Sequence, residues 1–147
     1  MIVISHRGNL NGPDKRTENT VGSICAAVWQ GYYCECDVWV KNGNFYLGHD
    51  GPKERADKVI GMDKVILHCK DLKAFQKIAE MGIHCFFHNK DLATITSRGW
   101  AWFYPSKSRF YGGVNVLPEL HHAHKTMNGV FGVCTDFPTK YRIGDLE

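Results

Sequence analysis

Short apolar segments alternate with helix-like segments along the first half of this chain, and this alternation restricts the possible folds more than any other feature. Residues 2–5 and 65–69 form strand-like apolar runs, whereas residues 18–30 and 72–80 carry apolar side chains at helical spacing. Strands separated by helices are typical of a parallel sheet with helices outside it. Further strand-like segments cover residues 32–40, 45–47, 83–87, 101–104, 114–117 and 130–135. The predicted fold class is α/β.

The length of the chain narrows this class. A chain of 147 residues favours one domain, predicted here to span residues 1–147. A complete eight-stranded α/β barrel usually takes about 200 residues or more. The segments between the later strands leave little room for helices, and the glycine motifs of nucleotide-binding open sheets are absent. The prediction is a compact or truncated (β/α) TIM-type barrel with short or missing outer helices.

Composition excludes several classes of function. A formal net charge of +3 with no run of five like charges argues against nucleic acid as a partner and suits a small anionic ligand. No stretch approaches the roughly 20 apolar residues of a membrane span. The first residues indicate a buried strand rather than a signal peptide, and the six cysteines form no CxxC pair. We therefore expect free thiols and a cytoplasmic protein.

The segment Cys34-Glu35-Cys36-Asp37-Val38 is the first indication of chemistry. Alternate residues of a strand face opposite sides, so Glu35 and Asp37 share one face and the two cysteines share the other. Two neighbouring carboxylates are costly to bury unless a cation neutralises them. A divalent cation is one solution, because hard cations prefer carboxylate oxygens. A solvated strand face, or pairing with Lys or Arg, is the alternative.

Other polar residues follow neighbouring strands. His6 and Arg7 come directly after residues 2–5, His49 follows the short strand 45–47, and His68 and Lys70 lie at the end of strand 65–69. Catalytic groups of α/β barrels gather at these strand ends. Arg7 and Lys70 suit a phosphate group, and two imidazoles can divide the proton transfers of phosphodiester cleavage between them. A metal ion can polarise the phosphoryl oxygens.

Several motifs together resemble those of a known family. They are His6-Arg7-Gly8, Glu18-Asn19-Thr20, Glu35-Cys36-Asp37-Val38, His49-Asp50 and, near the C-terminus, Thr135-Asp136-Phe137-Pro138. Their order and spacing are similar to those of the glycerophosphodiester phosphodiesterase family, within the phosphatidylinositol-phospholipase-C-like barrel superfamily. The firm resemblance covers roughly residues 2–50 and thins afterwards to Lys70 and residues 130–138.

The resemblance implies an α/β barrel that binds one Mg²⁺ or Ca²⁺ ion and cleaves a small phosphodiester or phosphorylated headgroup. It implies roles for individual residues as well. These are His6 and His49 as the acid/base pair, Glu35 and Asp37 as metal ligands, Glu18 beside the ion, and Arg7 and Lys70 near the phosphate.

Two departures from the family pattern concern the metal and the substrate. His68 stands where the family usually has a further glutamate that binds the metal. We expect either that His68 itself binds the metal or that a water molecule fills this ligand position. An imidazole ligand makes Mn²⁺ possible. Only residues 51–64 separate the His49 motif from the next strand, where many relatives have a sizeable insertion. The site is therefore expected to be open on that side.

The remaining aromatic and histidine residues have weaker indications. We expect Trp102 in the substrate site, where it or Tyr104 can stack on a sugar or choline-like group. His84 and His88 share a strand face, with His88 able to line the site. Residues 121–124, which hold three histidines, are expected to be a surface loop, and Glu119 is a weaker candidate for the pocket.

Four functions remain open. The first is a metal-dependent phosphodiesterase, and a close rival is a lyase of the phospholipase D toxin type that releases a cyclic phosphate. The third is a degenerate barrel that binds a phosphorylated ligand without turnover, and the fourth is a zinc hydrolase centred on the later histidines. Lost outer helices would leave apolar strand faces exposed, so a homodimer is a further expectation.

Overall fold

The computed structural model describes residues 1–121, 127 and 129–141, and in these it contains two α-helices and ten strands. The helices are α1 (Val21–Trp29) and α2 (Leu72–Glu80). The strands are β1 (Ile2–His6), β2 (Tyr33–Lys41), β3 (Asn44–Leu47), β4 (Glu54–Arg55), β5 (Val65–Cys69), β6 (Cys85–Phe87), β7 (Ala93–Ile95), β8 (Ala101–Phe103), β9 (Gly113–Val116) and β10 (Gly132–Thr135). Two 3₁₀ turns follow late strands, at Pro118–Leu120 and Pro138–Lys140.

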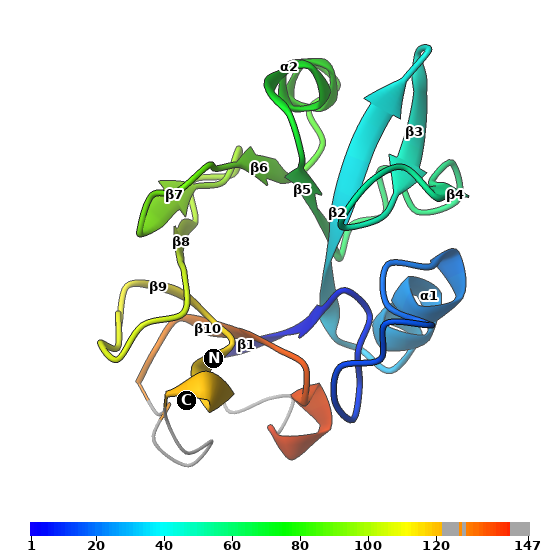
Figure 1. Cartoon of the computed structure of the whole chain (residues 1–147). Coiled ribbons are helices and arrows are strands. Elements are labelled where there is room, and N and C mark those ends of the chain that lie inside the picture. Colours follow the sequence, from blue (N-terminus) through cyan, green and yellow to red (C-terminus); the bar gives the residue numbers. More distant parts are fainter. Residues whose placement is uncertain (122–126, 128, 142–147) are drawn as a thin grey trace.

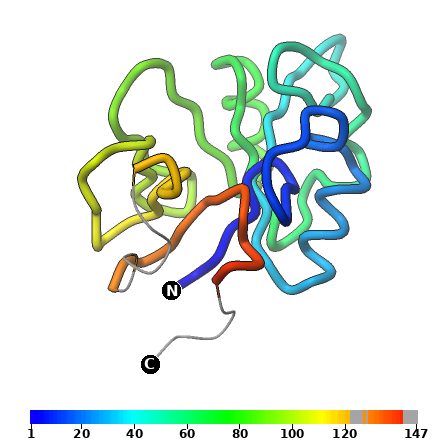
Figure 2. Tube along the Cα trace, turned by 60° about the horizontal axis from the view of Figure 1, so that its bottom comes forward, coloured from blue at the N-terminus to red at the C-terminus, as the bar shows by residue number. Residues whose placement is uncertain are grey.

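The strands form one curled, mixed sheet. Hydrogen-bonded neighbours follow the order β6-β5-β2-β1-β10-β9-β8-β7, and all of these pairs are parallel except β7 with β8. β3 and β4 branch from β2 as an antiparallel extension. The sheet bends around a common centre, with β1 and β10 opposite β5 and β6 (Figure 1). The first and last strands therefore lie side by side, as the trace in Figure 2 also shows.

The prediction of a TIM-type barrel, even a truncated one, is wrong. Strand and helix alternate only up to β6, because α1 and α2 are the only α-helices among the described residues. Nine residues, 104–112, join β8 to β9 without a helix. A crossover between parallel strands needs about a dozen residues to hold a helix. Among the described residues, α-helices cover only one part of this curled sheet.

The two helices cover the part of the sheet built from β2 and β5. Thr20 caps α1 and Asp71 caps α2 by accepting a hydrogen bond from a backbone N–H in the first turn. Ile24 of α1 and Ile78 of α2 are fully buried against the outward face of the sheet. The cysteines of β2 belong to this core, so the predicted alternation in β2 is confirmed and the opposite face is left to Glu35 and Asp37.

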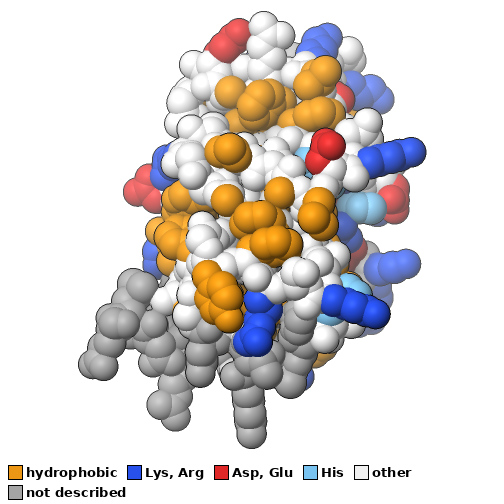
Figure 3. Space-filling model, turned by 90° about the vertical axis from the view of Figure 1, so that its left-hand side faces the viewer, with side chains coloured by type: hydrophobic (Ala, Val, Ile, Leu, Met, Phe, Trp, Pro, Cys, Tyr) orange, Lys and Arg blue, Asp and Glu red, His pale blue; other side chains and the backbone are white. Residues whose placement is uncertain are grey.

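The part of the sheet from β7 to β9 has no helix over it among the described residues. Hydrophobic side chains gather on this side of the molecule (Figure 3). Leu92, just before β7, is 59% exposed, and Ile95 of β7 is 70% exposed. The predicted homodimer would bury this side, and it stays a prediction. No helix in the described part of the chain is both long and apolar enough to cross a membrane.

Candidate functional site

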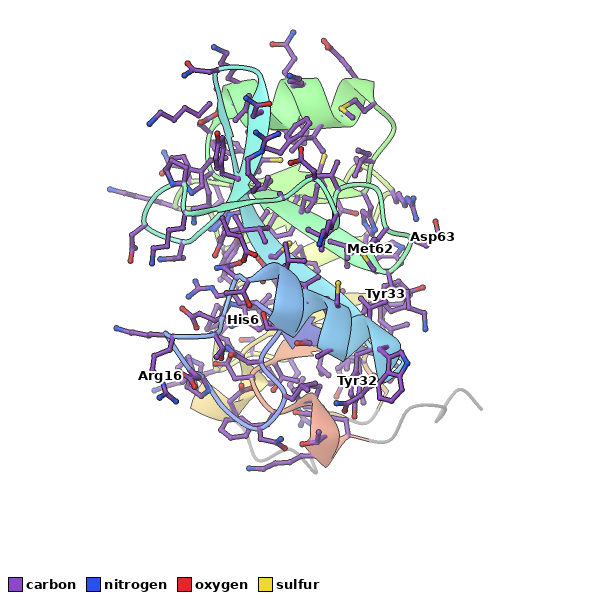
Figure 4. The ribbon with its side chains drawn as sticks, turned by 90° about the vertical axis from the view of Figure 1, so that its right-hand side faces the viewer. His6, Arg16, Tyr32, Tyr33, Met62 and Asp63 are labelled. Carbon is purple, nitrogen blue, oxygen red and sulfur yellow. The ribbon has the colours of Figure 1, made fainter. Side chains whose placement is uncertain are left out.

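Residues at the carboxyl ends of the parallel strands form the candidate site. His6 is the last residue of β1, and Asp136 directly follows β10. Asp37 lies within β2, opposite His68 of β5 in the strand register, and Lys70 directly follows β5. Figure 4 shows His6 on one side of the molecule, away from Tyr33 at the start of β2. Parallel pairing thus brings residues from both ends of the chain to one edge of the sheet.

A tight turn after β1 places Arg7. Its φ angle of +55° is left-handed, and its backbone N–H donates to the carbonyl of Glu35 across 2.8 Å. Gly8 follows with φ +80°, and a Cβ there would come within 2.8 Å of the backbone of Ser23 in α1. Only glycine allows this close approach. The turn directs the Arg7 side chain to two acids, with Nη1 3.2 Å from Glu18 Oε1 and Nε 3.1 Å from Asp37 Oδ2.

Asp37 is completely buried and is surrounded by donors. Its Oδ1 lies 3.0 Å from His68 Nδ1 and 3.1 Å from Lys70 Nζ, and its Oδ2 accepts from Asn19 Nδ2 across 2.8 Å. Asn19 also accepts from the Asp37 backbone N–H. Burial alone would raise the pKa of Asp37, but His68, Lys70 and Arg7 favour the carboxylate and hold that pKa well below its ordinary value.

Glu35 is 3% exposed, lines the cavity and has fewer partners than Asp37. Its Oε2 accepts a 3.3 Å hydrogen bond from the Arg7 backbone and lies 3.9 Å from His6 Nε2, while its Oε1 lies 3.7 Å from His68 Nδ1. Burial and the negative charge of Asp37 raise the pKa of Glu35, in spite of the two histidines and Arg7. The Glu35 carboxylate therefore lacks a close cation of its own.

His6 is held by a carboxylate from the other end of the chain. Its Nδ1 lies 2.8 Å from Asp136 Oδ1, which also accepts from Asn9 Nδ2 across 2.9 Å. This leaves His6 Nε2 directed towards Glu35. Burial would lower the pKa of His6, but the hydrogen bond to Asp136 and the charge of Glu35 outweigh it, so the pKa of His6 is raised. A carboxylate that fixes one ring nitrogen in this way is how proteins orient an imidazole for proton transfer.

Replacing Asp136 by Asn should therefore lower the pKa of His6. The imidazolium loses its negative partner, while the side-chain volume stays the same. Histidine titration followed by NMR would show the His6 midpoint moving to lower pH, and Asp50→Asn, at an exposed carboxylate, should leave that midpoint in place. A His6 midpoint unchanged in Asp136→Asn would contradict the pairing. The wild-type pairing stabilises the fold below the ordinary imidazole pKa, and this stabilisation is lost as pH rises through the folded-state pKa of His6.

Glu119 supports this pair from outside the cavity. Its Oε1 accepts from the backbone N–H of Asp136 across 2.9 Å and from the Thr135 hydroxyl across 3.0 Å. The pocket contact considered for Glu119 is absent, because the described lining of the cavity does not include it. Glu119 fixes the segment that carries Asp136.

His49 approaches the same site from the hairpin extension of β2. It follows Gly48, whose φ of +141° lets the chain fold back so closely that a Cβ would collide with the carbonyl oxygen of Gly51. The His49 side chain is 42% exposed, and its Nδ1 lies 2.7 Å from Asp50 Oδ1. Each of the two candidate catalytic histidines thus has a carboxylate on Nδ1, one buried and one exposed.

A cavity of about 260 Å³ connects these residues. Its polar lining includes His6, Arg7, Glu35, His49, His68, Lys70 and His88. Its other walls are mostly aromatic and apolar, and include Phe86, Trp102 and Tyr104. Trp102 is only 1% exposed and packs against Phe86 with ring centroids 4.6 Å apart, so it forms wall rather than a free stacking surface.

A second cavity, of about 330 Å³, lies alongside and shares Arg7 and His49 with the first. Lys15 and Lys53 line it together with Glu18 and Asp50. Because both cavities have His49 in their walls, the site extends outwards past this residue. This agrees with the expectation of an open side next to the short 51–64 connection.

The residues present fit a divalent cation. Glu35, Asp37 and His68 each offer one ligand atom, and these three atoms lie within 4.8 Å of one another. Glu18 is not part of this group, since it contacts Arg7 and Asn9 instead. The site holds four carboxylates and two permanent cations, with the imidazoles of His6 and His68 among them. The carboxylates are Glu18, Glu35, Asp37 and Asp136, and the cations are Arg7 and Lys70. A divalent ion would offset part of this carboxylate charge.

Three residues at this site were given no role from the sequence. Asp136 and Asn19 stood within the family-like motifs, but only their contacts with His6 and Asp37 reveal what they do. The sequence pattern that indicated His6 as a site residue also applies to Asp136, because each directly follows a predicted strand. Asn9 lies in a predicted loop and had no such signal.

The later histidines divide between core and cavity. His84 is buried with Nε2 2.9 Å from the Thr96 hydroxyl, and burial lowers its pKa to about 4. His88 lines the cavity, and burial together with His68 and Lys70 lowers its pKa to about 4. His121 is exposed, whereas His122 and His124 lie outside the described residues.

Comparison with protein-family models, curated proteins and solved structures returns no significant match, so the family resemblance stays a prediction.

Proposed function

We propose that this chain is a metal-dependent phosphodiesterase that acts on a small phosphodiester, such as a glycerophosphodiester, through His6 and His49. The observation that carries the proposal is the His6–Asp136 pair, 2.8 Å apart, in the wall of a cavity that His49, Arg7 and Lys70 also line. An oriented imidazole serves proton transfer, and ligand binding alone does not need it. The two basic side chains suit an anionic phosphate.

The two histidines differ in a way that suits different roles. His6 is buried and its pKa is raised, so it holds a proton more firmly and suits the general acid that protonates the leaving oxygen. His49 is more exposed and lies between the two cavities, where it can take a proton from an incoming hydroxyl or water. Asp37 holds Arg7 and Lys70 in place. We propose that the phosphate binds on the side of the cavity that these two basic side chains line.

Glu35, Asp37 and His68 are the residues that would hold the cation, for which we propose Mg²⁺ or Ca²⁺; the imidazole ligand makes Mn²⁺ possible as well. When bound, such an ion polarises phosphoryl oxygens and offsets the carboxylate charge that would otherwise repel the substrate. Glu35 must be deprotonated to serve as a ligand, and its raised pKa means that ion binding competes with a proton there.

Hydrolysis of bis-(p-nitrophenyl) phosphate and of glycerophosphocholine tests the proposal. Both are assayed with Mg²⁺, Mn²⁺ and Ca²⁺ and with EDTA, and His49→Asn and Glu35→Gln are compared with the exposed variant His121→Asn. We expect turnover that needs a cation, is lost in the first two variants and is retained in the third. Turnover equal in EDTA, or unchanged in His49→Asn, would refute the metal-dependent two-histidine reaction.

Two alternative functions would give different results in these assays. A lyase would release a cyclic phosphate from a substrate with a hydroxyl beside the phosphate, and phosphorus NMR of the products separates this species from an open phosphomonoester. A protein that only binds phosphorylated ligands would bind glycerol phosphate without turning over either substrate.

A further inference from the structure

The second cavity, of about 330 Å³, has lysine side chains in its walls from two separate loops. Lys15 comes from the loop between β1 and α1, and Lys53 comes from the loop between β3 and β4. Arg7 and His49 line both cavities, so this space lies directly beside the cavity in which the phosphodiester is proposed to bind. A ligand held in the first cavity can therefore extend into the second.

Backbone hydrogen bonds fix the positions from which the two lysines reach the cavity. The backbone N–H of Glu18 donates to the carbonyl four positions earlier across 2.8 Å, which closes a turn that contains Lys15. The backbone N–H of Lys53 donates to the carbonyl of Leu47, also across 2.8 Å. Both lysine side chains are exposed, but each is carried by a hydrogen-bonded segment of the chain. The cavity thus has a cation fixed at its base on each of two loops.

The two acidic side chains in the wall of this cavity already have partners. Oε1 of Glu18 lies 3.2 Å from Nη1 of Arg7, and Oδ1 of Asp50 lies 2.7 Å from Nδ1 of His49. His49 and, to a smaller extent, the charge of Lys53 lower the pKa of Asp50. Neither lysine takes part in an ion pair within the described part of the chain. The positive charge of the two lysines is therefore available to a ligand.

The chemistry of these two side chains indicates which group fits between them. An ammonium group is a compact positive charge with three donors, and it is a common partner of phosphate oxygens in proteins. A phosphate monoester has a charge of about −1.5 to −2 near neutral pH, which two lysines match. A neutral group would leave both charges unbalanced, and a cationic group would be repelled.

We propose that the second cavity is a subsite for a second phosphate group of the substrate, with Lys15 and Lys53 as the cations that bind it. The inference rests on the proposed function for the phosphodiester in the first cavity. Since Arg7 and His49 are common to both cavities, one molecule can occupy the two together. The substrate class is then a phosphodiester in which one of the two alcohols also carries a phosphate monoester.

Calorimetry with phosphorylated diols tests the subsite without requiring turnover. The probes are monophosphates and α,ω-bisphosphates of straight-chain diols of increasing length, titrated at one ionic strength and one concentration of free Mg²⁺. The wild type is compared with the double variant Lys15→Gln/Lys53→Gln. The matched control is Lys41→Gln/Lys58→Gln, which removes the same charge from exposed lysines outside both cavities.

We expect the wild type and the control to bind the bisphosphate of one length about tenfold more tightly than its monophosphate, as one charge-assisted contact implies. The Lys15→Gln/Lys53→Gln variant should lose this preference, while its affinity for the monophosphate should fall far less. All the replaced side chains are exposed, so Tm should stay close to that of the wild type in both double variants.

Three results would overturn the inference. They are a preference that is absent from the wild type at every length, one that persists in the Lys15→Gln/Lys53→Gln variant, and one that is lost equally in the control. The result also separates the subsite from the reaction. If bisphosphates are preferred but no phosphodiester is cleaved, the proposed reaction fails while the subsite stands. If phosphodiesters are cleaved but bisphosphates are not preferred, only the subsite fails.

Discussion

Replacing His6 by Asn is expected to lower the turnover of glycerophosphocholine by about 10²–10⁴-fold, the usual contribution of a general acid or base. The asparagine amide can still donate to Asp136 from the position of the imidazole Nδ1, so the contact that holds the segment after β10 is kept. What is lost is Nε2, the ring nitrogen on the side of Glu35 and the cavity.

The leaving group makes this prediction specific to the role of an acid. An alkoxide is a poor leaving group that needs a proton, whereas p-nitrophenolate is stable and leaves with little help. His6→Asn should therefore slow glycerophosphocholine cleavage far more than cleavage of bis-(p-nitrophenyl) phosphate, while His49→Asn should slow both alike. Measured kcat values for the two substrates decide this. Equal losses in His6→Asn would reassign His6 as the base, and no loss on either substrate would remove it from the reaction.

Replacing Asp37 by Asn is expected to lower the free energy of unfolding by about 3–5 kcal/mol, as the loss of one partner from a buried ion pair commonly does. Asp37 is fully buried, and Arg7, Lys70 and His68 all converge on its two oxygens. The amide keeps the volume but leaves these groups without their anion. Urea unfolding at neutral pH measures the loss.

A control and a pH series sharpen this prediction. Asp57→Asn, which removes the exposed partner of Arg55, should leave the free energy of unfolding nearly unchanged. Since the pKa of Asp37 is lowered by folding, its stabilisation is present above the ordinary Asp pKa and is lost as pH falls towards the folded-state value. The difference between wild type and Asp37→Asn should therefore narrow in acid. A difference that is small at neutral pH would mean that Asp37 stabilises little and serves the cation alone.

Local sequence patterns predicted the helices and strands well where the buried face in the structure follows the apolar periodicity of the sequence. The strand predicted at residues 65–69 and the helix predicted at residues 72–80 have these bounds in the structure, and the alternation of buried faces in β2 is confirmed. The helix expected from residue 18 begins only at Val21, because Asn19 takes a left-handed φ of +56° in order to reach Asp37. That conformation depends on a partner 18 residues away, which helical periodicity cannot register.

The architecture was missed for a different reason. Few helices were expected between the later strands, but these strands were still assigned to a strand–helix barrel, whereas the structure is a curled, mixed sheet in which β7 pairs antiparallel with β8. The strands β4 and β7, each of two or three residues, were also missed, since so short a segment has no periodicity to detect. The gathering of strand-end residues around one cavity was more predictable than the fold, because residues at strand ends converge in any parallel sheet that curls.

The pairing of β1 with β10 has a consequence for the order in which this protein is made. His6 and Asp136 are separated by 130 positions, and β1 lies between β2 and β10 in the sheet. During synthesis the N-terminal part emerges first, so a growing chain that has reached β9 already holds Glu35, Asp37 and His68 but not the carboxylate that orients His6. The proposed cation ligands are therefore synthesised before Asp136, the carboxylate that orients the proposed proton-transfer residue His6.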